Sequence, residues 1–344
     1  MDCACAKDGF CERYQREMHG RMRELCSGIN VDIGTAEAFR QQWVIEAKPS
    51  KDTPRRLVLK TAQAPGDALV MTAAIWSLHR ANPGKFLTSI ESLYPEVFEG
   101  NPDVSNGPGE ELQMHYPAIH QSNYRGIHFM QGYCEFLADV LGVKVPLLTN
   151  RPRLYFKAPP PREEAFWLIC SGGKLDFTNK LWGSYQEVVD SLQGKIAFIQ
   201  VGNLGMQHHH PKLRGVADFL GKTSLRELFE LVRRCSGALC GVSLMMHVAA
   251  ALEKPAIVIA GGREPVQWNA YPKQQYLHTV GMLPCCADGG CWRSRVLPLG
   301  DNAELDRDTC ERPVKGVPEC MTQILPGEVA KRVLSLQFNR PSIV

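Results

Sequence analysis

Short apolar runs, separated by turns that contain glycine and proline, recur along most of this chain. The first run, at residues 57–60, is followed by a turn at 64–67, an apolar helical stretch at 68–79 and a second short run at 86–90. Short runs of this kind indicate strands, and longer apolar stretches indicate helices. The order strand, glycine turn, helix and strand predicts a βαβ unit of a parallel sheet.

The same alternation restarts after a proline-rich segment at residues 146–161. A helix at 128–141 is expected to close the first half, and the proline-rich segment is expected to link two domains. Beyond the linker, the pattern predicts strands at 166–170, 195–201, 238–240 and 256–260, with helices at 185–192, 225–235 and 245–252. Two successive βα domains predict a cleft between the carboxyl ends of two parallel sheets.

The length of 344 residues supports this division, because a single hydrophobic core rarely serves so long a chain. The hydrophobic content of 44% and the charged content of 22% are those of a folded globular protein. We expect a cysteine-bearing segment at 1–50, an N-terminal domain at 51–157, a C-terminal domain at 162–330 and a tail at 331–344.

The net charge of +3, with acidic and basic residues interspersed, argues against strong nonspecific binding of nucleic acid. The longest apolar runs are far too short to span a bilayer. The N-terminus, Met1-Asp2-Cys3-Ala4-Cys5, lacks the basic and then apolar stretch of a secretory signal. We therefore expect a cytoplasmic protein without a membrane span.

The thirteen cysteines are many for a protein of a reducing compartment, where clustered cysteines more often bind metals than form disulfides. One group near the C-terminus contains Cys285, Cys286, Cys291, Cys310 and Cys320. Four thiolates of this group are expected to hold a structural iron or zinc ion, with the choice between Cys285 and Cys286 open and free thiols as the alternative. A less regular group, Cys3, Cys5, Cys11 and Cys26, is a candidate second metal site.

Asp67 follows Pro65-Gly66 at the first predicted strand-to-helix turn. Aspartate is a preferred N-cap residue, so an ordinary helix cap is one interpretation. The other is a carboxylate that faces the cleft and accepts a proton from an attacking hydroxyl.

Lysines follow the glycine turn Ser171-Gly172-Gly173 at the end of the first strand of the second half. A glycine turn with Lys174 and Lys180 suits a diphosphate, which accepts hydrogen bonds from backbone N–H groups and attracts ammonium charge. The alternative is that both lysines are simply solvated surface residues.

Later strand ends carry further candidates for contact with a nucleotide. Thr223 precedes a predicted helix start, where Ser224 and Glu227 form a typical capping pair. Met246 and His247 open the next helix, and Gly261, Gly262 and Glu264 follow the next strand. Adjacent glycines allow a backbone to approach a ligand closely. His208-His209-His210 is interpreted as a polar loop, because three consecutive side chains do not converge easily on one ion.

Together these motifs resemble the heptosyltransferase-type glycosyltransferases over residues 57–335. The resemblance rests on Gly66-Asp67-Ala68, Leu78 and Asn101-Pro102 in the first half, and on Lys180-x-Trp182, Gly221-Lys222-Thr223, Leu225 and Met246-His247-x-Ala249-Ala250-Ala251 before Pro255 in the second. It is nearest to the bacterial autotransporter heptosyltransferase branch, which carries a cysteine-rich metal finger near its C-terminus. The order and spacing of the motifs carry this resemblance.

The resemblance implies a GT-B fold, in which two Rossmann-like domains face a cleft, and an inverting transfer without a catalytic metal. It implies that Asp67 is the base, that Lys180 neutralises donor phosphate, and that Thr223 and His247 contact the donor. Many relatives have an aspartate ahead of the helix histidine where this chain has Gly241-Val242-Ser243-Leu244, so we expect this donor contact either to be lost or to be replaced by Ser243.

The expected activity is transfer of a heptose or similar sugar from a nucleotide-linked donor, ADP-linked by resemblance, to a protein hydroxyl or a glycan. Two alternatives remain at this stage. One is a non-catalytic protein that binds sugar nucleotides, and the other is a nucleotide-sugar epimerase of the same fold. The sequence leaves the oligomeric state open, a homo-oligomer included.

Overall fold

Parallel β-sheets form the centre of both halves of the protein. The computed structural model describes residues 53–114, 126–159, 161–174, 180–205, 208–287, 289–291 and 310–338, which all belong to one unit, Pro49–Val344. The cysteine-bearing segment at 1–50, with the cysteines at 3, 5, 11 and 26, lies outside the described residues. The two halves of this unit are described in turn.

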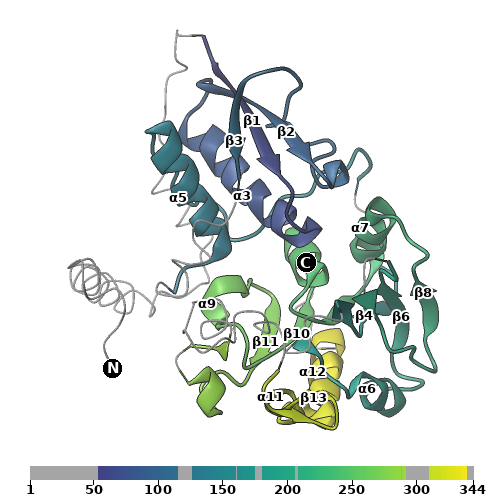
Figure 1. Ribbon diagram of the computed structural model, residues 1–344. Helices are drawn as coiled ribbons and strands as arrows, with labels where there is room; N and C mark the ends of the chain where they lie inside the picture. Colours follow the sequence, from purple (N-terminus) through teal and green to yellow (C-terminus); the bar gives the residue numbers. More distant parts are fainter. Residues whose placement is uncertain are drawn as a thin grey trace, which may run out of the picture. The chain divides into compact units, whose positions relative to one another are not determined.

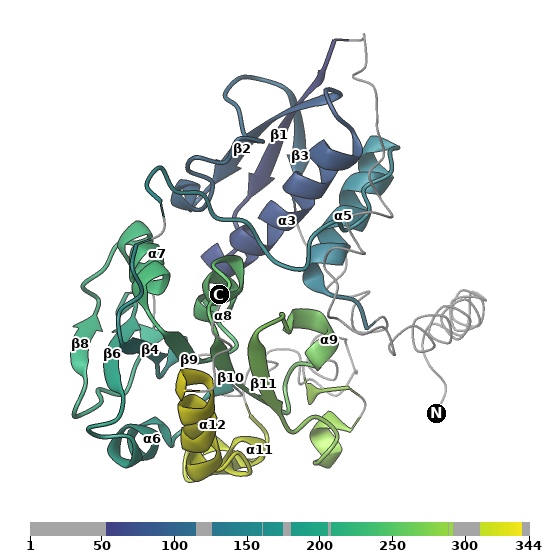
Figure 2. The ribbon, with the colours of Figure 1, turned by 180° about the vertical axis from the view of Figure 1, so that it is seen from behind.

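The N-terminal half contains a three-stranded parallel sheet in the order β2-β1-β3. Its strands are β1 (Arg55–Thr61), β2 (Phe86–Ser92) and β3 (Glu110–Gln113). The helices α3 (Pro65–Ala81) and α5 (Phe129–Leu141) pack against each other and cover the same face of this sheet (Figures 1 and 2). A short 3-10 helix, η2 (Pro95–Val97), follows β2. The predicted βαβ unit is therefore confirmed.

The C-terminal half contains a six-stranded parallel sheet in the order β11-β10-β9-β4-β6-β8 (Figure 1). In chain order its strands are β4 (Phe166–Cys170), β6 (Ala197–Gly202), β8 (Ala217–Leu220), β9 (Gly237–Gly241), β10 (Ala256–Gly261) and β11 (Gln274–His278). This is the strand order of a dinucleotide-binding Rossmann fold, with the order reversing between β4 and β9.

Helices cover both faces of this sheet, and they are α6 (Tyr185–Ser191), α7 (Leu225–Arg234), α8 (Leu244–Ala251), α9 (Val266–Asn269), α11 (Glu319–Thr322) and α12 (Pro326–Phe338). Side chains alternate between the two faces of β4. Trp167 and Ile169 join the core formed with α6 and α12, whereas Leu168 joins the core formed with α7 and α8. Burial on both faces explains why the central strands β4 and β10 are continuous apolar runs.

Smaller elements complete the C-terminal half. The strands β5 (Gly173–Lys174) and β7 (His208–His209) form an antiparallel pair, as do β12 (Pro313–Val314) and β13 (Val317–Pro318). A 3-10 helix, η4 (Pro284–Cys286), carries two of the clustered cysteines. The expectation of a loop at residues 208–210 is wrong for His208 and His209, because their backbone pairs with the glycine turn after β4.

Two further differences concern helix ends. Pro65 and Gly66 belong to the first turn of α3 rather than to a preceding turn, because Pro65 occupies the first helical position, which it tolerates well. The N-cap of α3 is Ala64, so the interpretation of Asp67 as the cap is wrong. The expected division at residue 330 remains untested, although α12 runs across it and buries Val329 and Val333. The capping pair Ser224 and Glu227 is confirmed as a full capping box on α7.

Candidate functional site

The carboxyl ends of β4 and β9 mark the point where the strand order of the larger sheet reverses. In open α/β sheets, ligands bind outside the carboxyl ends of strands at this point. Here Ser171 and Gly172 follow β4, and Ser243 follows β9 as the N-cap of α8. Ser243 lies beside the Cys170 and Cys240 thiols. The fold alone therefore makes the N-terminus of α8 a candidate binding site.

The first turn of α3 packs directly on the first turn of α8. A Cβ atom added to Gly66 would lie 3.2 Å from Cδ2 of His247 and 3.6 Å from Cα of Leu244. No larger residue fits this contact without displacing the imidazole. Asp67, the next residue, is half-buried and is therefore held at the junction between the two halves.

His247 lies at the centre of this junction, with 7% of its surface exposed. Its Nδ1 atom is 2.8 Å from the hydroxyl of Tyr271. Burial, reinforced by the positive potential of His128 and Lys180, lowers the pKa of His247 to about 3. Burial together with the Asp67 charge raises the pKa of Tyr271 well above its ordinary value. Both rings are therefore neutral near pH 7, and Tyr271 can donate to His247.

His128 brings the N-terminal half into the same cluster. Its Nδ1 atom accepts a hydrogen bond from the backbone N–H of Met130, which caps α5, and its ring makes an edge contact with Tyr271 at 4.8 Å between centroids. Burial lowers the pKa of His128 to about 4. Asp67 and His128 thus come from the first half, whereas His247 and Tyr271 come from the second.

Lys180 forms an ion pair with Glu264, with 3.0 Å between Nζ and Oε1. The Glu264 side chain is 5% exposed, and its carboxylate also accepts hydrogen bonds from Arg263 and from the side-chain amide of Asn269. The Arg263 side chain is only 1% exposed. Since buried charges are tolerated when they are paired, this network holds one ammonium group at the edge of the site.

The remaining predicted residues have more varied surroundings. Thr223 immediately precedes the N-cap of α7, and Met246 is fully buried, with its carbonyl accepting from the Gln274 amide at 2.7 Å. The backbone of Lys174 pairs with His208. Gly261 and Gly262 form the end of β10 and the step after it. Of the predicted residues, the structure therefore gathers Gly66, Asp67, Lys180, His247 and Glu264 most closely.

Four residues of this cluster were not predicted as site residues, namely His128, Arg263, Asn269 and Tyr271. His128 was assigned only to a helix, and Arg263 lies between the predicted residues Gly262 and Glu264. Asn269 ends the short helix α9 and Tyr271 lies just beyond it, in a polar and aromatic stretch that has no periodic pattern. Only a strand-end glycine pair at 261–262 signalled that the following residues face the site.

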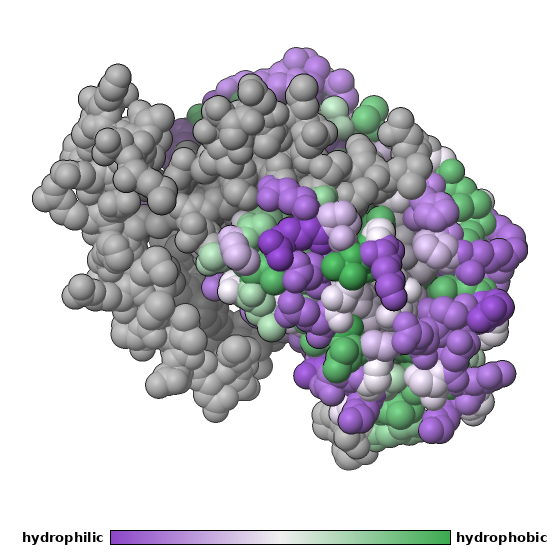
Figure 3. All heavy atoms as spheres, turned by 60° about the horizontal axis from the view of Figure 1, so that its bottom comes forward, coloured by the Kyte–Doolittle hydropathy of each residue, from purple (hydrophilic) through white to green (hydrophobic). Residues whose placement is uncertain are grey.

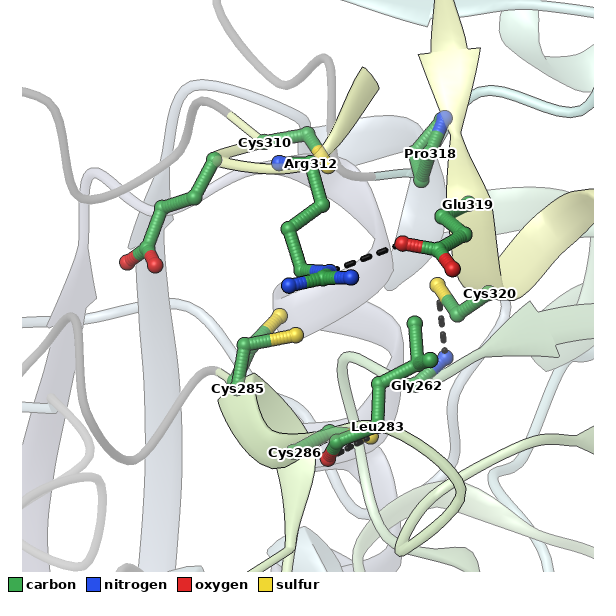
Figure 4. Close-up of a pocket in the computed structure, with 11 residues that line it drawn as sticks. Gly262, Leu283, Cys285, Cys286, Cys310, Arg312, Pro318, Glu319 and Cys320 are labelled. Atoms are coloured by element: carbon green, nitrogen blue, oxygen red, sulfur yellow. Dashed lines mark hydrogen bonds and ion pairs between the residues drawn. The ribbon is translucent and has the colours of Figure 1, made fainter. Parts of the chain in front are cut away.

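All five C-terminal cysteines line one pocket with about 400 Å³ of empty space. Figure 4 shows the sulfur atoms of Cys285 and Cys320 directed toward the Arg312 side chain, which is held by Glu319 through an Nε–Oε2 hydrogen bond of 2.8 Å. The described cysteines form no disulfide.

The thiols of this pocket differ in their hydrogen bonds. Sγ of Cys320 accepts from the backbone N–H of Gly262 at 3.3 Å, and Sγ of Cys310 accepts from that of Arg312 at 3.4 Å. Cys286 is instead 1% exposed, and its thiol lies within donating distance of the Thr279 and Leu283 carbonyls. Among the described residues, no three His, Cys, Asp or Glu side chains are placed to hold a metal ion. The structure therefore brings the five cysteines to one pocket, and the metal finger stays a prediction.

Residues 147–288 match Glycosyltransferase family 9 (heptosyltransferase). The chain resembles this family. The match spans all six strands of the larger sheet and contains both Lys180 and His247. It supports glycosyltransferase activity, as the sequence motifs predicted. Among curated proteins no relative matches the chain.

Solved structures with the same fold include three structures of two heptosyltransferase-type proteins. The iron-containing dodecameric glycosyltransferase TibC from enterotoxigenic E. coli H10407 has a TM-score of 0.60 and 19% identity, covering 86% of this chain and 78% of its own. Its complex with ADP-D-β-D-heptose has a TM-score of 0.57 at the same identity and coverage. The E. coli ADP-heptose LPS heptosyltransferase II has a TM-score of 0.53 and 13% identity, covering 83% of this chain and 99% of its own. These likenesses confirm the GT-B-like fold.

The described surface bears on possible partners. None of the helices in the described ranges is long and apolar enough to cross a membrane. Figure 3 shows the side that lies at the bottom of Figure 1, where apolar residues are scattered among polar ones. Scattered apolar residues are normal for a protein surface.

Proposed function

We propose that the chain is an inverting glycosyltransferase that transfers a heptose or similar sugar from an ADP-linked donor to a protein hydroxyl or a glycan. The observation that carries this proposal is the convergence of Asp67, Lys180 and His247 at the strand reversal of a family 9-like domain. The ADP-heptose complex of TibC supports the choice of donor.

Asp67 serves as the general base in this proposal. The acceptor hydroxyl attacks the anomeric carbon, the bond from that carbon to the diphosphate oxygen breaks, and the hydroxyl proton moves to the Asp67 carboxylate. Asp67 is suited to this role because it is half-buried at the junction and does not cap α3. A single displacement of this kind inverts the configuration at the anomeric carbon.

Charge develops on the leaving diphosphate as the sugar departs. Lys180 supplies a cation, and the first turn of α8 supplies N–H groups and the positive end of its dipole. Groups that are already oriented stabilise the transition state without further reorganisation. His247, which is neutral near pH 7, contributes a hydrogen-bonding group rather than charge. Thr223, Ser243, Met246, Lys174 and the glycines at 66, 261 and 262 complete the proposed donor site.

A structural iron or zinc ion fits the chemistry of the cysteine pocket, whose thiols are the ligands that these metals prefer. We propose Cys285, Cys291, Cys310 and Cys320 as the ligands, because all four line the pocket and backbone N–H groups donate hydrogen bonds to the Sγ atoms of Cys310 and Cys320. Cys286 is set aside as a core thiol. Such a closed site would stabilise the fold locally and take no part in the transfer.

Two further parts of the proposal concern location and assembly. The nine described cysteines are all free, which supports a reducing compartment such as the cytoplasm. TibC is dodecameric, and this supports a homo-oligomer for the present chain. The cysteines near the N-terminus are kept as a candidate second metal site.

Replacing Asp67 tests the proposed reaction. We expect Asp67→Asn to reduce transfer from ADP-heptose by at least about a hundredfold, the lower range for loss of a general base, while ADP binding is retained. Transfer is measured as ADP release together with the mass gained by the acceptor. The exposed Asp190 provides the control, since Asp190→Asn should leave transfer unchanged.

Full transfer by Asp67→Asn would remove Asp67 from its role as base. Binding of ADP-heptose without turnover by the wild-type protein, tested against protein and glycan acceptors, would favour the non-catalytic alternative. Conversion of the donor sugar without any acceptor would identify an epimerase.

A further inference from the structure

The ion pair between Lys180 and Glu264 has an unusual construction for two residues at a donor site. A lysine that contacts phosphate needs no carboxylate, and a nearby carboxylate reduces the local positive charge. Yet the Glu264 side chain is 5% exposed, whereas 29% of the Lys180 side chain is exposed. The carboxylate is therefore the buried and fixed partner of the pair, and the ammonium group is the one that solvent or a ligand can reach.

Glu264 is held from several directions. Its Oε1 atom accepts from both Lys180 and the buried Arg263, and its Oε2 atom accepts from the side-chain amide of Asn269. Asn269 is itself 1% exposed. A carboxylate with partners on both oxygens has little freedom to move. Its position therefore determines where Lys180 Nζ is held, 3.0 Å away.

The backbone that carries Glu264 is also fixed, and it is fixed from the cysteine pocket. A Cβ atom on Gly262 would lie 3.0 Å from Sγ of Cys286 and 3.3 Å from Cβ of Cys320. The Gly262 carbonyl accepts from the N–H of Cys291 at 3.0 Å, and its N–H donates to Cys320. Contacts with the cysteine pocket therefore fix the position of Gly262, two residues before Glu264.

We propose that Glu264 is a positioning residue, which acts on the donor through Lys180 instead of contacting it. An ammonium group has three N–H donors, so a lysine can bond a carboxylate and a diphosphate oxygen at the same time. A free lysine side chain loses much rotamer freedom when it binds, and a lysine that is already held loses less. This inference rests on the proposed function, because it assigns Lys180 to the donor diphosphate.

The direction of the effect separates positioning from simple charge. Glu264→Gln removes a negative charge near a trianionic ligand, and charge alone would make ADP bind more tightly. Loss of positioning acts the other way. We expect Glu264→Gln to weaken ADP binding by about tenfold, which is within the rotamer cost of one lysine, and to leave adenosine binding unchanged.

A double-mutant cycle tests whether Glu264 acts through Lys180. The dissociation constants of ADP and adenosine are measured by calorimetry for the wild type, Lys180→Ala, Glu264→Gln and the double variant. We expect Glu264→Gln to have no further effect on ADP affinity once Lys180 is alanine. A merely structural role would weaken ADP binding whether or not Lys180 is present.

Two further variants serve as control and safeguard. Glu163 forms an ion pair of the same 3.0 Å length with Lys254, so Glu163→Gln should leave ADP affinity unchanged. If Glu264→Gln does not fold because Arg263 loses its partner, Asn269→Ala replaces it in the cycle. This variant keeps the carboxylate charge but frees one oxygen, and we expect a smaller weakening of ADP binding.

The outcomes are distinct. Weaker ADP binding that disappears in the Lys180→Ala background supports the inference. Unchanged or tighter ADP binding by Glu264→Gln, or an equal loss in both backgrounds, overturns it while leaving the proposed function intact. Failure of the wild-type protein to bind ADP overturns the proposed function and this inference together.

Discussion

The pKa of the buried His247 side chain depends strongly on its surroundings. Its pKa is lowered to about 3, first by burial and then by the nearby His128 and Lys180. A histidine in an unfolded chain has a pKa near 6.5. Between about pH 3 and pH 6.5, His247 is therefore protonated in the unfolded chain but neutral in the folded protein. The free energy of unfolding therefore falls as the pH falls below about 6.5, and this histidine contributes to the fall down to about pH 3.

Replacing His247 by a residue that does not titrate should reduce this pH dependence. Between pH 6.5 and 4.5 we expect the free energy of unfolding to fall by about 2–3 kcal/mol less in His247→Gln than in the wild type, at about 1.4 kcal/mol per pH unit. Urea denaturation at a series of pH values measures the slope. Equal slopes for wild type and His247→Gln would show that His247 titrates normally.

At the scale of elements, strands and helices with local signals could be predicted. The helix α7 was predicted from its capping pair, and β4 and β10 were predicted from apolar runs that are buried on both faces. The edge strands β3, β8 and β11 were missed, because an edge strand keeps polar side chains and loses the apolar run.

The candidate site was predictable only where a strand end or a helix start carried it. Asp67, Lys180 and His247 were found in this way. The pair Lys180–Glu264 and the contact of Tyr271 with His247 join residues from separate elements, so only the folded chain brings them together. Alternatives that were open in the sequence, such as Asp67 as a cap, depended on where α3 begins.

The neighbouring cysteines of η4, Cys285 and Cys286, have different surroundings and different proposed roles. Cys285 lines the pocket with its sulfur directed inward, whereas the Cys286 thiol lies toward carbonyls of the core (Figure 4). We expect Cys285→Ser to lose about one metal ion per chain and Cys286→Ser to retain it, because only the first removes a thiolate ligand. Elemental analysis of protein purified without chelator gives the metal content.

Cys286→Ser is the matched control for Cys285→Ser, because the two residues are neighbours and the substitution is the same. Metal loss in Cys286→Ser alone would reverse the assignment of the two cysteines. A wild-type protein that is folded and free of metal would contradict the metal finger altogether, and would leave the pocket as a cluster of free thiols.

At the scale of the whole molecule, the proposed mechanism depends on the contact between the two halves. The first turn of α3 in one half meets the first turn of α8 in the other, at the strand reversal of a Rossmann-like sheet. Asp67 lies on the first side of this junction, and Lys180 and His247 lie on the second. We assign the donor diphosphate to the side of Lys180 and His247, and the acceptor hydroxyl to the side of Asp67.

A crystal structure of the protein with bound ADP tests this assignment most directly. We predict that the diphosphate lies within hydrogen-bonding distance of Lys180 Nζ and of the backbone N–H groups at the start of α8. Its terminal phosphate should lie on the side of Asp67. ADP bound elsewhere, or with its phosphates directed away from Lys180 and α8, would contradict it.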